Sequence, residues 1–263
     1  MLNDKFALYE YAVQSPDVHV NHFSRMYQEI RGGAAHRLRE DFCGTAKVCV
    51  EWIKRDPQNR ALGLDLDSET LEYGEKKHLK KLSLALRERV TLMEQDVRKP
   101  TQEKSDIIAG CNFSFCIFKD RPTLLSYFRA AHKSLDAHGI FVLELAGGPG
   151  MMETTQETRG IFVGGKKKYT YVWDQKNYDP ITNEGLYSIH FKIPGRKTMK
   201  DAFVYDWRMW TIPEVCDAMK EVGFKETRVY WETEHKGVGT GEYVHMEKGD
   251  NSYSWIAYIV GVR

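Results

Sequence analysis

Strand and helix patterns alternate along residues 37–145, and this alternation limits the possible fold more than any other feature of the chain. Short apolar runs with strand character are each followed by a segment whose apolar side chains recur at helical spacing. Repeated units of this kind form a parallel sheet with helices on both faces and right-handed crossovers. The pattern therefore predicts an α/β fold with a doubly wound, mostly parallel sheet. The expected strands are 37–42, 60–65, 90–93, 106–109 and 140–145, and the expected helices are 46–55, 68–80 and 121–135.

A further helix is expected before the first strand. Residues 17–31 follow a Ser-Pro-Asp start signal and carry apolar side chains at helical spacing, and Gly32 and Gly33 end the pattern. We expect residues 1–33 to form an N-terminal helical cap.

The period of the pattern changes after residue 150. Residues 161–210 contain four runs rich in aromatic and β-branched side chains, separated by turn signals such as Pro194-Gly195. Runs of this kind form an antiparallel sheet. We therefore expect residues 151–209 to form an inserted β subdomain that acts as a lid over a substrate.

The C-terminal segment returns to the α/β pattern. A helix is expected over 212–222, because Thr211 and Glu214 form a capping-box signature at its start. Two last strands, 227–231 and 255–262, flank a glycine-rich segment with hairpin character at 235–250. The whole chain, 1–263, then forms a single domain whose seven-stranded sheet ends in an antiparallel hairpin.

Composition narrows the setting in which the protein works. The first residues are acidic and polar where a secretory signal needs a basic start and an apolar run, and no segment is apolar for the ~20 residues that span a bilayer. The five cysteines lack the Cys-x-x-Cys spacing of a zinc site. We expect a cytoplasmic protein with free thiols, no membrane contact and no metal.

Charge gives no general attraction to nucleic acid, because the net charge is +1 and the pI is about 7.7. The compact basic run Lys166-Lys167-Lys168 follows Gly164-Gly165 and is typical of a solvated hairpin tip.

Acidic residues follow three successive strands of the predicted sheet. Asp41, Asp65 and Asp96 each come at the end of a strand, where open α/β sheets bind their ligands. An acid about twenty residues after the first Gly-rich turn is suited to a ribose diol. The dinucleotide pattern Gly-x-Gly-x-x-Gly is absent around Gly44, and an acid at Asp41 would repel a pyrophosphate. The sequence favours a nucleoside site without a pyrophosphate.

Four motifs then identify a resemblance. Asp-Phe-Cys-Gly-Thr at 41–45, Leu-Gly-Leu-Asp at 62–65, Glu-Gln-Asp-Val at 94–97 and Phe-Val-Leu-Glu-Leu at 141–145 resemble the ordered motifs of class I S-adenosylmethionine (SAM)-dependent methyltransferases. The resemblance covers residues 36–146 and extends to 210–224.

The resemblance implies roles for individual residues. Asp41 would face the methionine amino group of SAM, Asp65 would bind the ribose hydroxyls, and Asp96 would meet the adenine amino group. The family pattern departs at Ala46, where many members have glycine, and Tyr9 or Tyr11 would close over the cofactor. The implied SAM-binding residues are Asp41, Phe42, Gly44, Thr45, Asp65, Leu66, Asp96, Val97 and Asn112.

The inserted sheet would hold the methyl acceptor. Its aromatic side chains exclude water and stabilise cations. A nucleophile that carries a proton also benefits from a base. The candidate substrate-binding residues are Tyr171, Trp173, Trp207 and Arg208, and the candidate catalytic residues are His190, Asp206 and Glu232.

A small-molecule acceptor with a reacting N or O atom is expected. Asn112 is followed by Phe-Ser, not by the Pro-Pro-Tyr of enzymes that methylate nucleobase or glutamine nitrogens. The alternatives are an NAD(P)-dependent oxidoreductase, an RNA or DNA methyltransferase that uses Lys166–Lys168, and a nucleoside-binding protein without enzymatic activity.

Overall fold

A central sheet of eight strands organises the chain in the computed structural model, which describes residues 4–235 and 238–263. The strand order is β11-β10-β12-β5-β4-β1-β2-β3. Strands β1 to β5 run parallel, and β12, β10 and β11 pair antiparallel in turn at one side. The bounds are β1 Arg37–Asp41, β2 Arg60–Asp65, β3 Val90–Glu94, β4 Ser105–Gly110, β5 Leu135–Gly147, β10 Glu226–His235, β11 Val238–His245 and β12 Trp255–Val262.

The predicted doubly wound α/β fold is confirmed, but the sheet has eight strands and the expected number of seven was wrong. The additional strand, β11, lies in the glycine-rich segment 235–250, of which residues 236–237 lie outside the described part. Most side chains of β11 are exposed, so that no apolar alternation marks it in the sequence. Its pairing with β10 forms the edge of the sheet.

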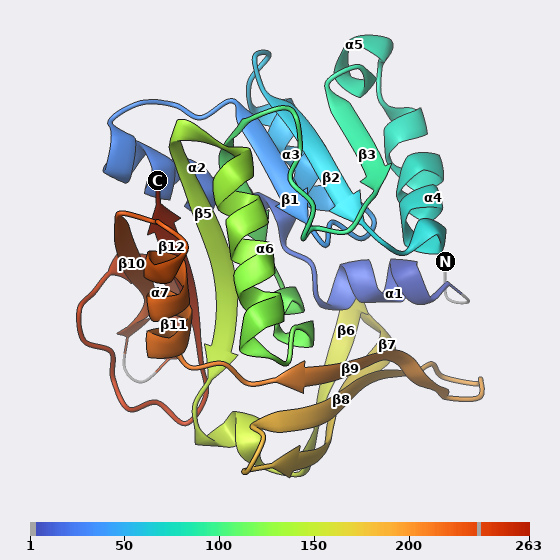
Figure 1. Cartoon of the computed structure of the whole chain (residues 1–263). Coiled ribbons are helices and arrows are strands. Elements are labelled where there is room, and N and C mark those ends of the chain that lie inside the picture. Colours follow the sequence, from blue (N-terminus) through green and yellow to red (C-terminus); the bar gives the residue numbers. More distant parts are fainter. Residues whose placement is uncertain (1–3, 236–237) are drawn as a thin grey trace.

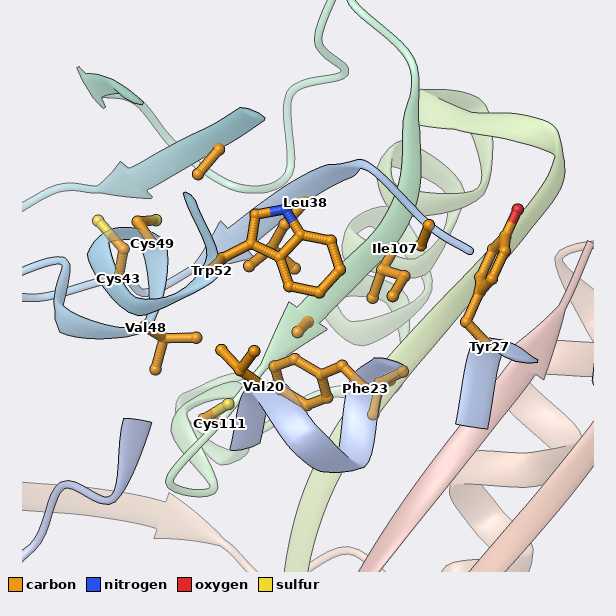
Figure 2. Packing of buried hydrophobic residues seen from close by; sticks show 14 of the residues in the cluster. Val20, Phe23, Tyr27, Leu38, Cys43, Val48, Cys49, Trp52, Ile107 and Cys111 are labelled. Atoms are coloured by element: carbon orange, nitrogen blue, oxygen red, sulfur yellow. The ribbon is translucent and has the colours of Figure 1, made fainter. Parts of the chain in front are cut away.

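Helices cover both faces of the sheet. Figure 1 shows α6 and α7 in front of the sheet and α2 and α3 behind it. Behind the sheet, Phe23 of α2 and Trp52 of α3 pack over Leu38 and Ile107 (Figure 2), and all four are buried. The helices are α1 Lys5–Ala12, α2 Pro16–Arg31, α3 Lys47–Arg55, α4 Ser68–Lys77, α5 Leu84–Arg87, α6 Arg121–Ser134 and α7 Ile212–Glu221, with 3₁₀ turns at Leu79–Lys81, Ser114–Ile117 and Pro149–Met152.

The local signals explain where helices begin. The expected capping box is present in α7, where Thr211 accepts from the Glu214 amide and the Glu214 side chain accepts from the Thr211 amide. The side chain of Asp67 caps α4 by accepting the Glu69 amide, and the side chain of Asp120 caps α6 by accepting the Thr123 amide.

A second, four-stranded antiparallel sheet is inserted between β5 and α7, as the change of period predicts. Figure 1 shows this sheet, yellow to orange, lying across the carboxyl ends of the central strands. Its order is β6-β7-β8-β9. The bounds are β6 Thr155–Val163, β7 Lys166–Asp179, β8 Glu184–Lys192 and β9 Met199–Arg208.

Helix α1 joins the two sheets. It lies within the expected helical cap of residues 1–33, although the sequence analysis gave no separate helix there. On one side Phe6 packs on Tyr73 of α4, with ring centroids 4.9 Å apart. On the other side Tyr9 packs on Phe203 of the inserted sheet, and the Tyr169 hydroxyl donates to the Leu8 carbonyl. Because α1 has neighbours on opposite sides, its apolar residues form no single stripe.

Among the described residues, no helix combines the length and the apolar character that crossing a bilayer requires.

Candidate functional site

The loop after β1 turns sharply back toward the sheet. Phe42, Gly44 and Ala46 have positive φ angles of 56°, 54° and 61°. A non-glycine residue in this region costs about 1–2 kcal/mol. The backbone therefore takes left-handed conformations at three alternate positions although the sequence supplies one glycine. Ala46, where the family pattern often has glycine, thus has the left-handed conformation that glycine adopts readily.

Asp65 ties this loop to the end of β2. Its Oδ2 accepts the Gly44 amide at 2.8 Å, and its Oδ1 accepts the Asp67 amide at 2.9 Å. Leu66, beside it, is 64% exposed. A carboxylate of fixed orientation and an open apolar side chain thus lie next to each other, the pair that a ribose diol and a purine face require.

Asp41 does not face this loop, and its predicted contact with the methionine amino group is corrected here. The side chain is fully buried on the α6 side of the sheet, where Arg39 donates to both oxygens at 2.6 and 3.1 Å. The Tyr127 hydroxyl also donates to Asp41 at 3.0 Å. Alternation along a strand sends neighbouring side chains to opposite faces, and the side chain of Asp41 is on the face that α6 covers.

The side chain of Glu40 lies on the opposite face of β1 from Asp41, and Glu40 was not among the predicted site residues. It lies on the α3 side, where its carboxylate accepts the Cys49 amide at 3.1 Å. Burial, together with the negative charges of Asp65 and Asp41, raises the pKa of Glu40 to about 8. The alternation of β1 was the signal that could have identified it.

Two of the residues after β3 are bonded to other residues of the chain. Arg98 donates to both oxygens of Asp96 and lowers the pKa of that carboxyl. Val97 is buried, and its carbonyl accepts from Arg39.

After β4 the chain makes another left-handed turn, with φ angles of 53° at Asn112 and 57° at Phe113. The Asn112 amide donates to Glu144 of β5 at 2.6 Å. Tyr258 links Glu144 to His19, with an O–O distance of 3.4 Å to the carboxylate and an O–N distance of 3.0 Å to Nδ1. Glu144, the single acid among residues 140–147 of β5, therefore holds the Asn112 turn in place.

In the described part of the chain, one group of possible metal ligands is close enough together to bind an ion. Donor atoms of His19, Cys111 and Glu144 lie within 4.8 Å of one another, and all three residues are buried. Two of the three already belong to the hydrogen-bonded network around Tyr258, which accounts for their burial without an ion.

A cavity of about 370 Å³ opens between Asn112 and the inserted sheet. The ends of β4 and β5 form one wall, the start of β12 another, and the aromatic face of the inserted sheet closes it. Helix α1 contributes Tyr9. The lining residues are Tyr9, Val13, Asn112, Phe113, Ala146, Gly150, Met151, Glu157, Tyr171, Trp173, Gln175, Ile189, Tyr205, Trp207, Glu232, Ser254, Trp255 and Ile256.

The candidate acceptor-site residues lie on different faces of their strands, and those on one face line the cavity. Tyr171, Trp173, Trp207 and Glu232 line the cavity. Tyr9 also lines it, whereas Tyr11 is largely exposed.

His190, Asp206 and Arg208 do not line the cavity, which corrects their predicted roles. His190 alternates with the lining residue Ile189 and is bonded to Asp174 at 3.0 Å on the far face. Asp206, between two lining residues, pairs with Lys119 at 2.5 Å. The guanidinium of Arg208 lies 3.9 Å from the Trp210 ring centroid.

Comparison with protein-family models and with curated proteins finds no match. Solved structures, in contrast, resemble the chain over almost its whole length. An amino pentose methyltransferase from Micromonospora echinaspora, solved with SAM, is 17% identical with a TM-score of 0.70, over 98% of this chain and 95% of that one. A SAM-dependent methyltransferase from Clostridium acetobutylicum is 16% identical with a TM-score of 0.71, over 99% of each chain.

A sugar N-methyltransferase from Streptoalloteichus is also similar, with 17% identity and a TM-score of 0.66 over 99% of this chain and 92% of that one. At these identities the likeness shows a common fold.

Proposed function

We propose that this chain, which has the fold of class I SAM-dependent methyltransferases, transfers a methyl group from SAM to a small-molecule acceptor by direct in-line displacement. The observation that carries the proposal is the order of the strand ends along the carboxyl edge. The left-handed loop after β1 lies between Asp65 at the end of β2 and Asn112 after β4, and Asn112 lines the aromatic cavity. The similarity to methyltransferases that act on sugars supports a small acceptor.

The residues at the strand ends fit SAM, a nucleoside that has no pyrophosphate. Asp65 would accept from the ribose hydroxyls, Leu66 would cover one face of the adenine, and Val97 would border its edge. The backbone of Phe42, Gly44 and Thr45 would line the methionine portion. SAM, when bound, supplies a methyl group on a positively charged sulfur.

The negative charge near the methionine amino group would come from Glu40 and not from Asp41. Glu40 is buried on the same side of the sheet as α3, close enough to Asp65 for the two charges to interact. An ammonium group placed between these carboxylates would favour ionised Glu40, because opposite charges lower the pKa of a carboxyl.

The chain's own contribution to the reaction would be to position the acceptor and exclude water. Effective concentration and alignment alone supply a large part of the acceleration of a methyl transfer. The inserted sheet, within residues 151–209, would act as the lid, and α1, within residues 1–33, as the cap. Of the three catalytic candidates, Glu232 remains as a proton acceptor because its carboxylate borders the cavity.

We also propose a cytoplasmic location. All five cysteines are free, and Cys43, Cys49, Cys111 and Cys116 are buried. Unpaired thiols are typical of a reducing compartment.

Isothermal titration with S-adenosylhomocysteine (SAH), the reaction product, tests the cofactor site. Asp65→Ala should weaken SAH binding by about 1–3 kcal/mol through loss of the ribose hydrogen bonds. Asp67→Ala is the matched control, because Asp67 caps α4 and has no proposed ribose contact. Equal affinity of wild type and a folded Asp65→Ala variant would refute the assignment.

A further inference from the structure

The charged side chains that line the acceptor cavity are acidic. Glu157 and Glu232 are its ionisable acids, and among the described residues its lining contains no lysine, arginine or histidine. Arg159 lies nearby on β6, but its guanidinium donates to the Ala12 carbonyl and stacks 5.5 Å from the Tyr171 ring centroid. A cavity of this composition repels phosphates and carboxylates and attracts cations.

Glu232 is held by a hydrogen bond to one of its two carboxylate oxygens. Its Oε1 accepts the Gly241 amide at 2.8 Å. A Cβ added at Gly239 would lie 2.5 Å from Oε1, so Gly239 packs directly against the carboxylate. The protein therefore holds Oε1 in place, and no described residue bonds to Oε2.

Aromatic rings form the opposite wall. Tyr205 and Trp207 stack with centroids 4.5 Å apart, and Trp173 lies about 6 Å from each of them. Ring faces attract cations by roughly 0.5–2 kcal/mol each. They also cover flat apolar groups.

The phenols of this wall stay neutral. Burial raises the pKa of Tyr171 to about 12 and the pKa values of Tyr9 and Tyr205 above their ordinary range. The negative charge of the cavity thus comes from the two carboxylates.

We propose that the acceptor is a primary or secondary amine on an apolar, ring-sized body, and that it enters as an ammonium ion. This inference rests on the proposed methyltransferase function and narrows it from N or O acceptors to cationic amines. Glu232 Oε2 would bind the ammonium, and the aromatic wall would hold the apolar body.

The chemistry balances without a further reactant. The ammonium gives one proton to Glu232 and gains a lone pair. The lone pair forms the new N–C bond while the C–S bond breaks, and the electrons of that bond remain on sulfur in SAH. The proton on Glu232 then passes to solvent.

The test is calorimetric binding of three matched probes to the protein saturated with SAH: 2-phenylethylamine, 2-phenylethanol and 3-phenylpropanoate. The amine should bind at least tenfold more tightly than the alcohol, and the carboxylate most weakly. Glu232→Gln keeps an oxygen for the Gly241 amide and should reduce amine affinity about tenfold without changing alcohol affinity.

Glu234→Gln is the control, because Glu234 lies on the same strand, accepts from Ser252 and does not line the cavity. Equal binding of the three probes, no binding of any of them, or an equal effect of Glu232→Gln on amine and alcohol would overturn the inference. SAH binding is measured first: its absence would refute the proposed function, whereas SAH binding without amine preference would refute this inference alone.

Discussion

The loop after β1 and the inserted sheet both lie at the carboxyl ends of the central strands (Figure 1) but expose different parts of the chain there. In the loop, left-handed turns and the fixed carboxylate of Asp65 present backbone and strand-end groups. In the inserted sheet, the aromatic side chains of Trp173, Tyr205 and Trp207 line the cavity. The first arrangement suits a ligand of constant chemistry such as a cofactor, and the second suits an acceptor chosen by shape and charge.

Among the predicted substitutions, the largest effect on stability and amine binding is expected at Trp207. It is buried in the aromatic stack, and Trp207→Ala should lower the free energy of unfolding by about 3–5 kcal/mol through the cavity it leaves. SAH affinity of the folded variant should change less than threefold, while 2-phenylethylamine binding is lost.

Phe162→Ala is the control for denaturant unfolding, because Phe162 is an exposed aromatic residue of β6 and should contribute little. A large loss of SAH affinity in Trp207→Ala would mean that the two halves of the site are not separate.

The pH dependence of SAH binding tests whether Glu40 lies near the amino group of the bound ligand. With a pKa of about 8, Glu40 is largely protonated at pH 6–7 in the free protein. A bound ammonium favours the ionised form, so binding releases a proton and affinity should rise from pH 6 to pH 8, by at most tenfold per pH unit. Glu40→Gln should remove this slope, as measured by calorimetry in buffers of different ionisation enthalpy.

Glu40 has a corresponding effect on stability. Its pKa is raised above the ordinary value of 4.5, so the folded state holds a proton that the unfolded state releases between pH 4.5 and 8. Its contribution should therefore make the unfolding free energy fall as pH rises through that range. A Glu40→Gln difference that does not vary with pH would contradict the assigned pKa.

The smallest effect is expected at His190. Its ring is bonded to Asp174 and to the Asp201 amide on the face away from the cavity. His190→Gln should change SAH and amine affinity less than twofold, with any loss confined to stability. A tenfold loss of amine affinity would return His190 to the acceptor site.

Elements with a strong apolar pattern were predictable from the sequence. Strands 60–65 and 255–262 have the expected bounds, because both are runs with buried side chains. A separate helix at α1 and strand β11 were missed, since α1 packs on two sides and β11 is stabilised by edge pairing rather than by burial.

The errors in the site have a common physical cause. Asp41 and Glu40, or Asp206 and Trp207, differ by one position on a strand, and one position exchanges the two faces. The sequence places these residues near the site, but the phase depends on which helix or strand packs on each face. Tyr127 and Lys119, which bind the two aspartates, are distant in the sequence.

Thermal unfolding with SAH, with NAD or with NADP tests the central claim most directly. A ligand at about 100 times its dissociation constant adds roughly 2.7 kcal/mol to the stability of the folded state. We expect SAH to raise the midpoint by several degrees and neither nicotinamide cofactor to do so. A shift with NAD or NADP alone, or no shift with SAH at saturating concentration, would contradict the proposed function.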